Sequence, residues 1–428
     1  MMAFVTVAVF LVVYTLIATE RVPRVVAVLG GVAAVFAIGI VGAQESFYSE
    51  ETGIDWNVIF LLLGMMLVVA GLRRTGLFEY IAVWSAKRTR GRPYPLLVLL
   101  CTLTAVASAL LDNVTTVLLV APVTLLVCSR LKLNPIPFLI AEVLASNIGG
   151  ASTLVGDPPN IIIGSRADLS FMDFVINLGP IIVIAMIAFL LLARFVFRDA
   201  FTFDAAAAES VMQLDEREAI ADPKLLVRGL AVLSLVLVGF VLQRTLGIDP
   251  SIVALLGGGA MMLAVPGPTD EYMNHVEWET LVFFMGLFVL VGALVEVGAI
   301  DALATALTDA VGGDPIAATF GILFGSAALS AIVDNIPYVA TMSPVVEQLA
   351  ANDPSLNPGN VLWWSLALGA DLGGNATAIG ASANVVVIGI AKRYGYPISF
   401  WQFTRYGLLV TVVTVLLCVP YLWLRYLV

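Results

Sequence analysis

The chain has 428 residues, of which 60% are hydrophobic and 12% are charged. An average soluble globular protein carries about 25% charged residues, so this composition excludes a soluble globular fold. It indicates a polytopic membrane protein whose partner is the lipid bilayer. The net charge of −10 gives no support to nucleic-acid binding, which uses basic surfaces.

Apolar runs divide the first half of the chain into spans, each of which needs about 20 apolar residues. The first run continues into Glu20 without a small-residue cleavage site, so we interpret it as a span and not as a signal peptide. A short amphipathic piece at 77–85 precedes a basic run. The expected spans are 3–18, 25–41, 56–72, an interrupted span within 138–164, and 174–197.

Two further apolar arms, 95–111 and 114–128, are joined only by Asp112 and Asn113. A polar junction this short leaves no room for an extramembrane loop. We therefore predict a re-entrant helical hairpin over 95–128, which enters and leaves the membrane on one face.

The interrupted span contains residues 147–160, which read N-I-G-G-A-S-T-L-V-G-D-P-P-N. Its two glycines weaken a helix, and its two prolines remove backbone donors. A break inside a membrane is tolerated only where it is buried in protein or lines a wet cavity. We predict a broken helix over 137–166, with Asp157 at or near membrane depth.

The same features recur in the second half. The break reappears over 371–384 as D-L-G-G-N-A-T-A-I-G-A-S-A-N, and several residues recur 222 positions later, which indicates an internal duplication. We expect a second hairpin over 315–351 and a second broken helix over 361–393. The recurring pairs are Trp56/Trp278, Gly64/Gly286, Gly76/Gly298, Asp112/Asp334 and Asn113/Asn335.

The expected architecture is an all-α membrane protein with two inverted-topology repeats, 1–197 and 229–428, joined by an acidic linker at 198–228. Each repeat has five crossings plus a hairpin, and an odd number of crossings inverts the second repeat. Basic residues gather on the linker side, and basic loops stay in the cytoplasm. The predicted location is the plasma (inner) membrane, with both termini outside and the linker in the cytoplasm.

Four polar clusters then converge at the centre, and paired broken helices point to a transporter binding site. Helix N-termini suit negative groups, whereas carboxylates and unwound carbonyls suit Na⁺ or H⁺ as the coupling ion. Na⁺ is assigned to the two hairpin tips, and no other cofactor is expected. The candidate residues are Asp112, Asn113, Thr115 and Thr116 (first tip); Ser152, Thr153, Asp157 and Asn160 (first break); Asp334 and Asn335 (second tip); and Asp371, Asn375, Thr377, Ser382 and Asn384 (second break).

Structural roles are the alternative for several of these residues. Asn113 and Asn335 would cap the hairpin helices, and Asp157 would cap the short helix that follows it. The Ser and Thr residues would satisfy backbone groups opened by the breaks. Asp112 and Asp334 are symmetric acids between apolar arms, so we assign them to ion or proton coupling.

Glu142, His275 and the three cysteines are not included among the candidate site residues. Glu142, two turns before the first break, is either a proton-relay acid or a locally paired one, and His275 belongs to a solvated polar loop. Cys101, Cys128 and Cys418 lie in apolar runs without metal-like spacing, so we assign them to packing.

The motifs L-D-N-V-T-T at 111–116, I-A-E-V at 140–143 and the break sequence resemble the ion transporter superfamily. Within it they are most similar to the branch of ArsB-type arsenite pumps, NhaD-type sodium/proton antiporters and the P protein. The resemblance implies a scaffold, often dimeric, and a transport domain that moves like an elevator. The Asp112 and Asp334 tips depart from the Ser-Asn-Thr tips of the superfamily's anion symporters, which disfavours citrate or succinate by charge repulsion.

The function expected from the resemblance is ion-coupled secondary transport, with efflux of arsenite or antimonite, a small metalloid substrate, as the first candidate. A Na⁺/H⁺ antiporter is the alternative that the acids favour, and a carrier of an inorganic or organic anion is a second alternative. An ion-conducting pore is a different class. Neither a nucleophile–base arrangement nor a nucleotide loop supports an enzyme, so energy comes from a gradient or from a soluble ATPase partner.

Overall fold

The computed structural model describes residues 2–19, 21–49, 51–213, 215–220 and 222–428, and in these ranges every regular element is helical. The first half, up to the linker, consists of successive helices, of which α3 is the shortest. Its bounds are α1 Met2–Ala18, α2 Arg24–Ile38, α3 Ala43–Phe47, α4 Trp56–Arg73, α5 Leu77–Arg88, α6 Pro93–Leu110, α7 Asn113–Arg130, α8 Pro135–Gly150, α9 Pro158–Arg166, α10 Phe171–Asn177 and α11 Gly179–Val196.

After the linker helix α12, Ala205–Met212, the second half repeats the order of long and short helices except that no helix among the described residues corresponds to α10. The final helix ends in a short π-helical turn, Trp423–Leu427. The bounds are α13 Pro223–Leu246, α14 Pro250–Ala264, α15 Thr269–Asn274, α16 Trp278–Glu296, α17 Ala299–Val311, α18 Pro315–Ser330, α19 Asn335–Asn352, α20 Val361–Gly373, α21 Ser382–Arg393 and α22 Phe400–Leu422.

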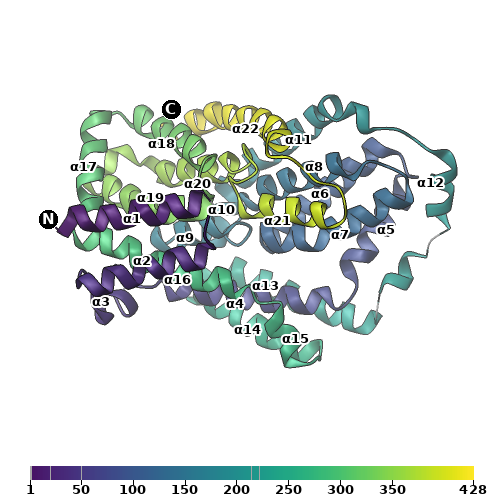
Figure 1. Ribbon diagram of the computed structural model, residues 1–428, viewed down its shortest axis with the longest axis horizontal. Coiled ribbons are helices and arrows are strands. Elements are labelled where there is room, and N and C mark those ends of the chain that lie inside the picture. The colour runs from purple at the N-terminus through teal and green to yellow at the C-terminus, as the bar shows by residue number, and fades with distance from the viewer. Residues whose placement is uncertain (1, 20, 50, 214, 221) are drawn as a thin grey trace.

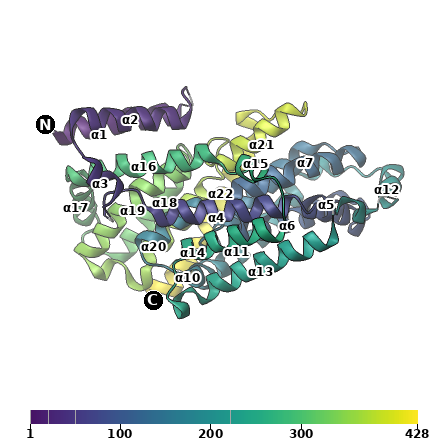
Figure 2. The ribbon, with the colours of Figure 1, turned by 90° about the horizontal axis from the view of Figure 1, so that it is seen from below.

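The stretches expected as hairpins form the helix pairs α6–α7 and α18–α19. The second helix of each pair contains an internal proline, Pro122 in α7 and Pro344 in α19. Figures 1 and 2 show α18 and α19 toward one end of the molecule and α6 and α7 toward the other. The two pairs therefore approach the centre from opposite ends.

Each hairpin packs against the broken helix of its own half, α6 on α8 and α18 on α20. A side chain on Gly149 of α8 would overlap the backbone of Ala105 in α6, and one on Gly373 of α20 would overlap Ala327 in α18. The paired glycines of the two breaks are thus needed because the helices cross with their backbones in contact.

A second set of close crossings joins α4 to α14 and α16 to α2. A Cβ on Gly64 of α4 would overlap the backbone of Ala254, and one on Gly286 of α16 would overlap the side chain of Val28. The glycines that recur 222 residues apart in the sequence therefore occupy matching crossings in two matching helix pairs.

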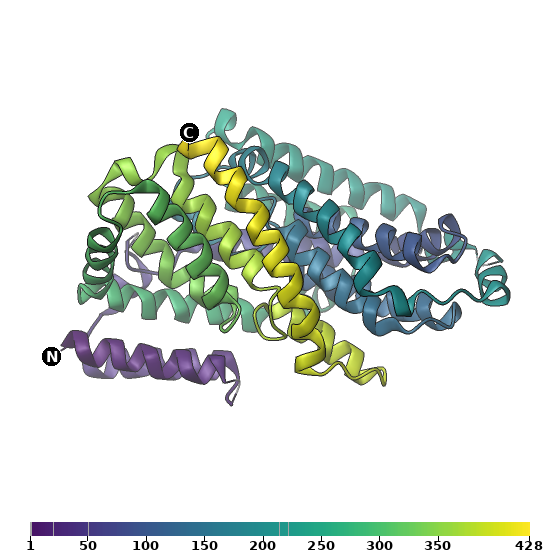
Figure 3. The ribbon, with the colours of Figure 1, turned by 90° about the horizontal axis from the view of Figure 1, so that it is seen from above.

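Seven of the described helices are long and apolar enough to cross a membrane: α4, α6, α7, α11, α13, α16 and α22 with its π-turn. The expected span 174–197 is interrupted, because α10 ends at Asn177 and α11 begins at Gly179 with Pro180 in its first turn. A proline there removes a donor that a continuous helix would need. In Figure 3, α22 crosses one face of the molecule diagonally, and it packs on α11 and α20.

The linker lies at the end of the molecule opposite the two termini (Figure 1). It is held to the first half by charged contacts, in which Lys87 pairs with Glu216 and Lys132 pairs with Asp204 at 3.2 Å. The termini and the linker therefore lie at opposite ends of the helical body.

Candidate functional site

The centre of the site is Asp157, which is 0% exposed and lies where the two hairpin tips meet. Its Oδ2 accepts a hydrogen bond from Asn113 Nδ2 at 2.8 Å, and both of its oxygens lie 3.3 Å from Asn335 Nδ2. Its side chain makes no capping bond to α9, so the capping alternative is wrong for this residue. One carboxylate of the first break thus joins the tips of both halves.

The caps of the hairpin helices are the aspartates and not the asparagines. Asp112 accepts from the backbone N–H of Thr115 at 2.7 Å, and Asp334 Oδ1 accepts from the N–H of Ile336 at 3.1 Å. The alternative in which Asn113 and Asn335 cap these helices is therefore wrong. Because an aspartate fills each N-cap position, the next residue is free to turn its amide toward Asp157.

A chain of buried amides continues from this carboxylate into the second half. Asn113 Nδ2 also lies 3.2 Å from Asn147 Oδ1, and Asn147 Nδ2 donates to the side-chain oxygens of Asn375 and Asn384, both at 3.0 Å. Asn147 is absent from the residues selected from the sequence. Its alignment with Asp371, both first in their break motifs, is the signal that identifies it.

Other polar groups of the breaks bond to backbone, as the structural alternative expects. Thr153 Oγ1 donates to the carbonyl of Ala109 at 2.5 Å, and Thr377 makes the matching bond in its own half at 2.6 Å. Asn160 Nδ2 donates to the carbonyl of Thr153 at 3.0 Å, and Asn384 repeats this bond at 2.9 Å. These side chains replace the helical hydrogen bonds that the breaks remove.

The three remaining candidates, Ser152, Thr115 and Thr116, differ in their hydrogen bonds. Ser152 Oγ donates to the carbonyl of Gly149 at 2.6 Å, which is a local bond within the break. Thr115 contributes its backbone N–H to Asp112. The buried hydroxyl of Thr116 has no hydrogen-bond partner among the residues that the structure describes.

Asp371 differs from the other acids of the site in its lack of hydrogen-bond donors among the described residues. It is 0% exposed, and neither of its oxygens accepts a hydrogen bond within the described parts of the chain. It interacts electrostatically with Asp157 and with the amide of Asn160, whose N–H groups donate elsewhere. Two buried carboxylates therefore face the same interior, one bonded to both tips and one without a donor.

Asp334 is paired with a residue that we did not select from the sequence. Arg24, at the start of α2, donates to Asp334 Oδ2 at 2.8 Å and to Ser382 Oγ at 2.6 Å, and Ser382 donates to the same Asp334 oxygen at 2.6 Å. The contact joins α2 to the second tip and the second break. Asp112 occupies the corresponding place on the first tip, but the residue corresponding to Arg24, 227 positions later, is Ser251.

A cavity of about 810 Å³, here called the tip cavity, reaches this central region. It is bounded by the start of α2, by α4, by the first hairpin tip, by the start of α16 and by α21. Its charged lining residues are Arg24, Asp112, Glu277 and Glu279. The wall therefore carries three carboxylates and one guanidinium group, which is already bonded to Asp334.

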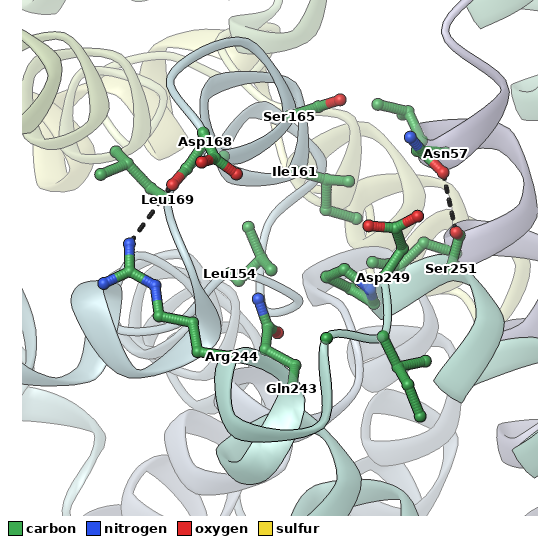
Figure 4. Close-up of a pocket in the computed structure, with 16 residues that line it drawn as sticks. Asn57, Leu154, Ile161, Ser165, Asp168, Leu169, Gln243, Arg244, Asp249 and Ser251 are labelled. Carbon is green, nitrogen blue, oxygen red and sulfur yellow. Dashed lines mark hydrogen bonds between the residues drawn. The ribbon is translucent and has the colours of Figure 1, made fainter.

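A smaller cavity of about 330 Å³ lies between the starts of α4 and α14, helix α9 and the end of α13 (Figure 4). These elements correspond, through the duplication, to those around the tip cavity. Hydrogen bonds from Ser251 Oγ to Asn57 Oδ1 at 2.8 Å and from Arg244 to the carbonyl of Asp168 at 3.4 Å cross its rim (Figure 4). No hairpin-tip residue is part of its lining.

Glu142 and His275 form hydrogen bonds with nearby residues outside the site. Glu142 is buried and accepts from Thr124 Oγ1 at 2.6 Å, while its second oxygen has no donor among the described residues. His275 Nδ1 lies 2.6 Å from the carbonyl oxygen of Glu271. The three cysteines are buried. Among the described residues, no three or more His, Cys, Asp or Glu side chains lie together so that they could hold a metal ion.

Comparison with known proteins identifies the family. The sequence profile described as citrate transporter (CitMHS) matches residues 14–369. The chain belongs to the citrate transporter family. Its relatives in this family include the uncharacterized transporter Rv2684 of Mycobacterium tuberculosis, 55% identical over 99% of both chains, and the 46 kDa membrane protein of Mycobacterium leprae, 53% identical over 100% of both.

More distant members and one solved structure extend the comparison. The human P protein is 34% identical over 94% of this chain and 57% of its own length, which confirms the resemblance to the ion transporter superfamily. The crystal structure of the YdaH transporter of Alcanivorax borkumensis has a TM-score of 0.55 at 15% identity, covering 85% of this chain and 84% of that one. As a citrate transporter family member, the protein is an all-helical membrane transporter.

Proposed function

We propose that the transporter exchanges a small cation, with Na⁺ as the best candidate, for protons. The observation that carries this proposal is the pair Asp157 and Asp371, both fully buried, of which Asp371 has no donor to either oxygen among the described residues. An ionised carboxylate in such surroundings costs several kcal/mol, roughly, unless a cation or a proton neutralises it. A site that alternates between these two partners performs the exchange.

The oxygens around this pair suit a hard cation. Asn113 Oδ1 and Asn160 Oδ1 are buried and accept no hydrogen bond within the described residues. Carboxylate and amide oxygens at broken helices are the groups with which secondary transporters coordinate Na⁺. We therefore place the cation near Asp157 and Asp371, between the two breaks.

The two hairpin tips have different roles in this proposal. Arg24 already neutralises Asp334, so a cation at the second tip would compete with a guanidinium group 2.8 Å away. Asp112 lies on the tip cavity, where a cation from the aqueous phase can approach it. Of the two tip acids assigned to coupling, Asp112 is thus the first to meet a cation that enters the tip cavity. Asp334 instead pairs with Arg24 of α2.

The walls of the tip cavity argue against citrate as the substrate. The carboxylates of Asp112 and Glu279 would repel a tricarboxylate, and the positive charge of Arg24 is already paired with Asp334. Arsenite, largely a neutral trihydroxide, escapes this repulsion, and the amide chain from Asn113 through Asn147 to Asn375 offers both donors and acceptors for its hydroxyl groups. Arsenite efflux is therefore the second candidate.

The proposed cycle is alternating access. The tip cavity opens beside Arg24, on the side where basic residues gather, which we assign to the cytoplasm. The smaller cavity of Figure 4 is its counterpart on the other side and ends before the tips. Movement of the hairpins and broken helices against α2, α4, α14 and α16 would open one cavity as it narrows the other.

The experiment compares three substrates in everted membrane vesicles that hold the full chain. A pH gradient is established, and its collapse on addition of Na⁺ is followed with a pH-sensitive dye, beside uptake of arsenite and of citrate. Na⁺-dependent collapse above that of vesicles without the protein supports the exchange. Accumulation of arsenite or citrate without any response to Na⁺ would replace it with the corresponding substrate.

A further inference from the structure

Glu277 lies on the wall of the tip cavity, in the connection between α15 and α16, immediately before the membrane-spanning helix begins at Trp278. The duplication aligns it with Asp55, 222 residues earlier, which caps α4 by accepting from the N–H groups of Asn57 and Val58 at 3.0 and 3.2 Å. Glu277 makes no such bond to α16. Capping therefore does not explain an acid at this position.

The carboxylate of Glu277 bonds to a side chain in the first turn of α16 and not to its backbone N–H groups. Oε2 accepts from the hydroxyl of Thr280 at 3.0 Å, whereas Oε1 is buried and has no hydrogen-bond partner among the described residues. A buried carboxylate oxygen without a donor is costly when ionised and inexpensive when it carries a proton. The geometry therefore favours a protonated carboxyl group in this conformation.

The acidic groups that line the same cavity as Glu277 also favour its protonated form. Asp112 of the first hairpin tip lines the same cavity, together with Glu279, and Arg24, which also lines it, is bonded to Asp334. A second cavity of about 170 Å³, which Glu277 also lines, has Arg73 and His275 in its wall, and the positive charge of Arg73 favours the ionised carboxylate. Burial, with the charge of Asp112 second, raises the pKa of Glu277 to about 7, where it can gain and lose a proton in the physiological range.

We propose that Glu277 carries a proton that the transporter exchanges for its cation, in addition to the proton that the buried pair Asp157 and Asp371 binds. As the cation reaches Asp112, its positive charge offsets the repulsion between the two carboxylates. The O–H bond of Glu277 then breaks, the electron pair stays on the carboxylate, and the proton passes to water in the tip cavity. When the cation leaves, Glu277 takes up a proton from the same water. This inference rests on the proposed cation/proton exchange.

The two acids belong to parts of the protein that are proposed to move relative to each other. Glu277 precedes α16, which packs on α2, whereas Asp112 is at the tip of a hairpin. Movement of the hairpin away from α16 would remove the charge of Asp112 and with it part of the proton affinity of Glu277. Proton release is thereby linked to the conformational change and not only to cation binding.

The test uses Glu277→Gln with Glu279→Gln as the matched control, since Glu279 lines the same cavity two residues later and is exposed. The purified full-length protein is titrated while infrared spectroscopy follows the C=O stretch of protonated carboxyl groups. We expect wild type and Glu279→Gln to lose a band with a midpoint near pH 7, and Glu277→Gln to lack it. The same band in Glu277→Gln would overturn the assignment.

A transport measurement and a second variant complete the design. In vesicles, the pH dependence of Na⁺-driven proton movement should flatten around neutrality in Glu277→Gln and stay unchanged in Glu279→Gln. Glu277→Asp, which places an acid of the Asp55 type at the cap, should keep transport with a midpoint moved to lower pH. An unaltered pH profile in Glu277→Gln would contradict the role. If wild type shows no Na⁺/H⁺ exchange, the proposed function fails, and the infrared titration alone decides whether Glu277 binds the proton.

Discussion

Replacing Asp157 by asparagine removes the one carboxylate that both hairpin tips share. Asn113 and Asn335 donate to it from 2.8 and 3.3 Å, and both reach Oδ2. In Asp157→Asn an amide oxygen at that position still accepts from both donors, but the negative charge is lost and Asn335 Nδ2 also faces an NH₂ group. A hydrogen bond to a charged group contributes ~1.5–3 kcal/mol, and tenfold in rate corresponds to about 1.4 kcal/mol, so exchange should fall at least ~10-fold.

The assay is the initial rate of Na⁺-driven proton movement in proteoliposomes that contain a trapped pH dye. The control is Asp309→Asn, which makes the same chemical change at an exposed position of α17. Both variants are first compared with wild type by size-exclusion chromatography, so that a loss of rate is not a loss of folded protein. Wild-type rates in Asp157→Asn at every pH would show that the shared carboxylate has no part in transport.

The remaining predictions concern coupling, topology and packing. Asp112→Asn and Asp334→Asn should each abolish transport in folded protein, and Asp334→Asn should also lower the melting temperature more, because it replaces the charged acceptor of Arg24 with a neutral amide; wild-type-like transport in both would remove the tip acids from coupling. A cysteine placed at Thr202 in the linker should react with a membrane-impermeant thiol reagent only after cells are permeabilised, against a low background because the native cysteines are buried, and labelling of intact cells would reverse the topology. Gly149→Ala should destabilise the protein by ~1–3 kcal/mol through overlap with Ala105, whereas Gly321→Ala, which meets no neighbouring atom, should not; equal melting temperatures for the two variants would contradict the close crossing.

The sequence was sufficient for the parts of the fold that local chemistry determines. The pairs Asp112–Asn113 and Asp334–Asn335 allow no long loop between two apolar arms, and the structure has hairpin helices on each side of both. The recurring glycines, such as Gly64, mark positions where backbones touch. Both kinds of signal depend on a few neighbouring residues and are therefore readable without a structure.

The site residues that sequence analysis missed depend on contacts between distant segments. Arg24 is 310 residues from Asp334, and by sequence it is one more basic residue at the end of an apolar run. Glu277 lies in the same polar loop as His275, and nothing nearby in the sequence shows that it lines one cavity with Asp112. The roles of Asn113 and Asn335 were also undecided, since cap preferences alone do not distinguish an asparagine from the aspartate beside it.

The bond network around Asp157 has a consequence for how the two halves depend on each other. Asp157 belongs to one gene-duplicated half and Asn335 to the other, while Asn147 bonds with Asn375 and Asn384 across the same boundary. Either half alone would leave part of these hydrogen bonds unmade, because Asp157 would lose Asn335 and Asn147 Nδ2 would lose both of its acceptors. Fragments cut within the acidic connector should consequently be unstable when produced singly and should assemble into a working unit when made together, and a substitution accepted in one half would require a compensating change in the other.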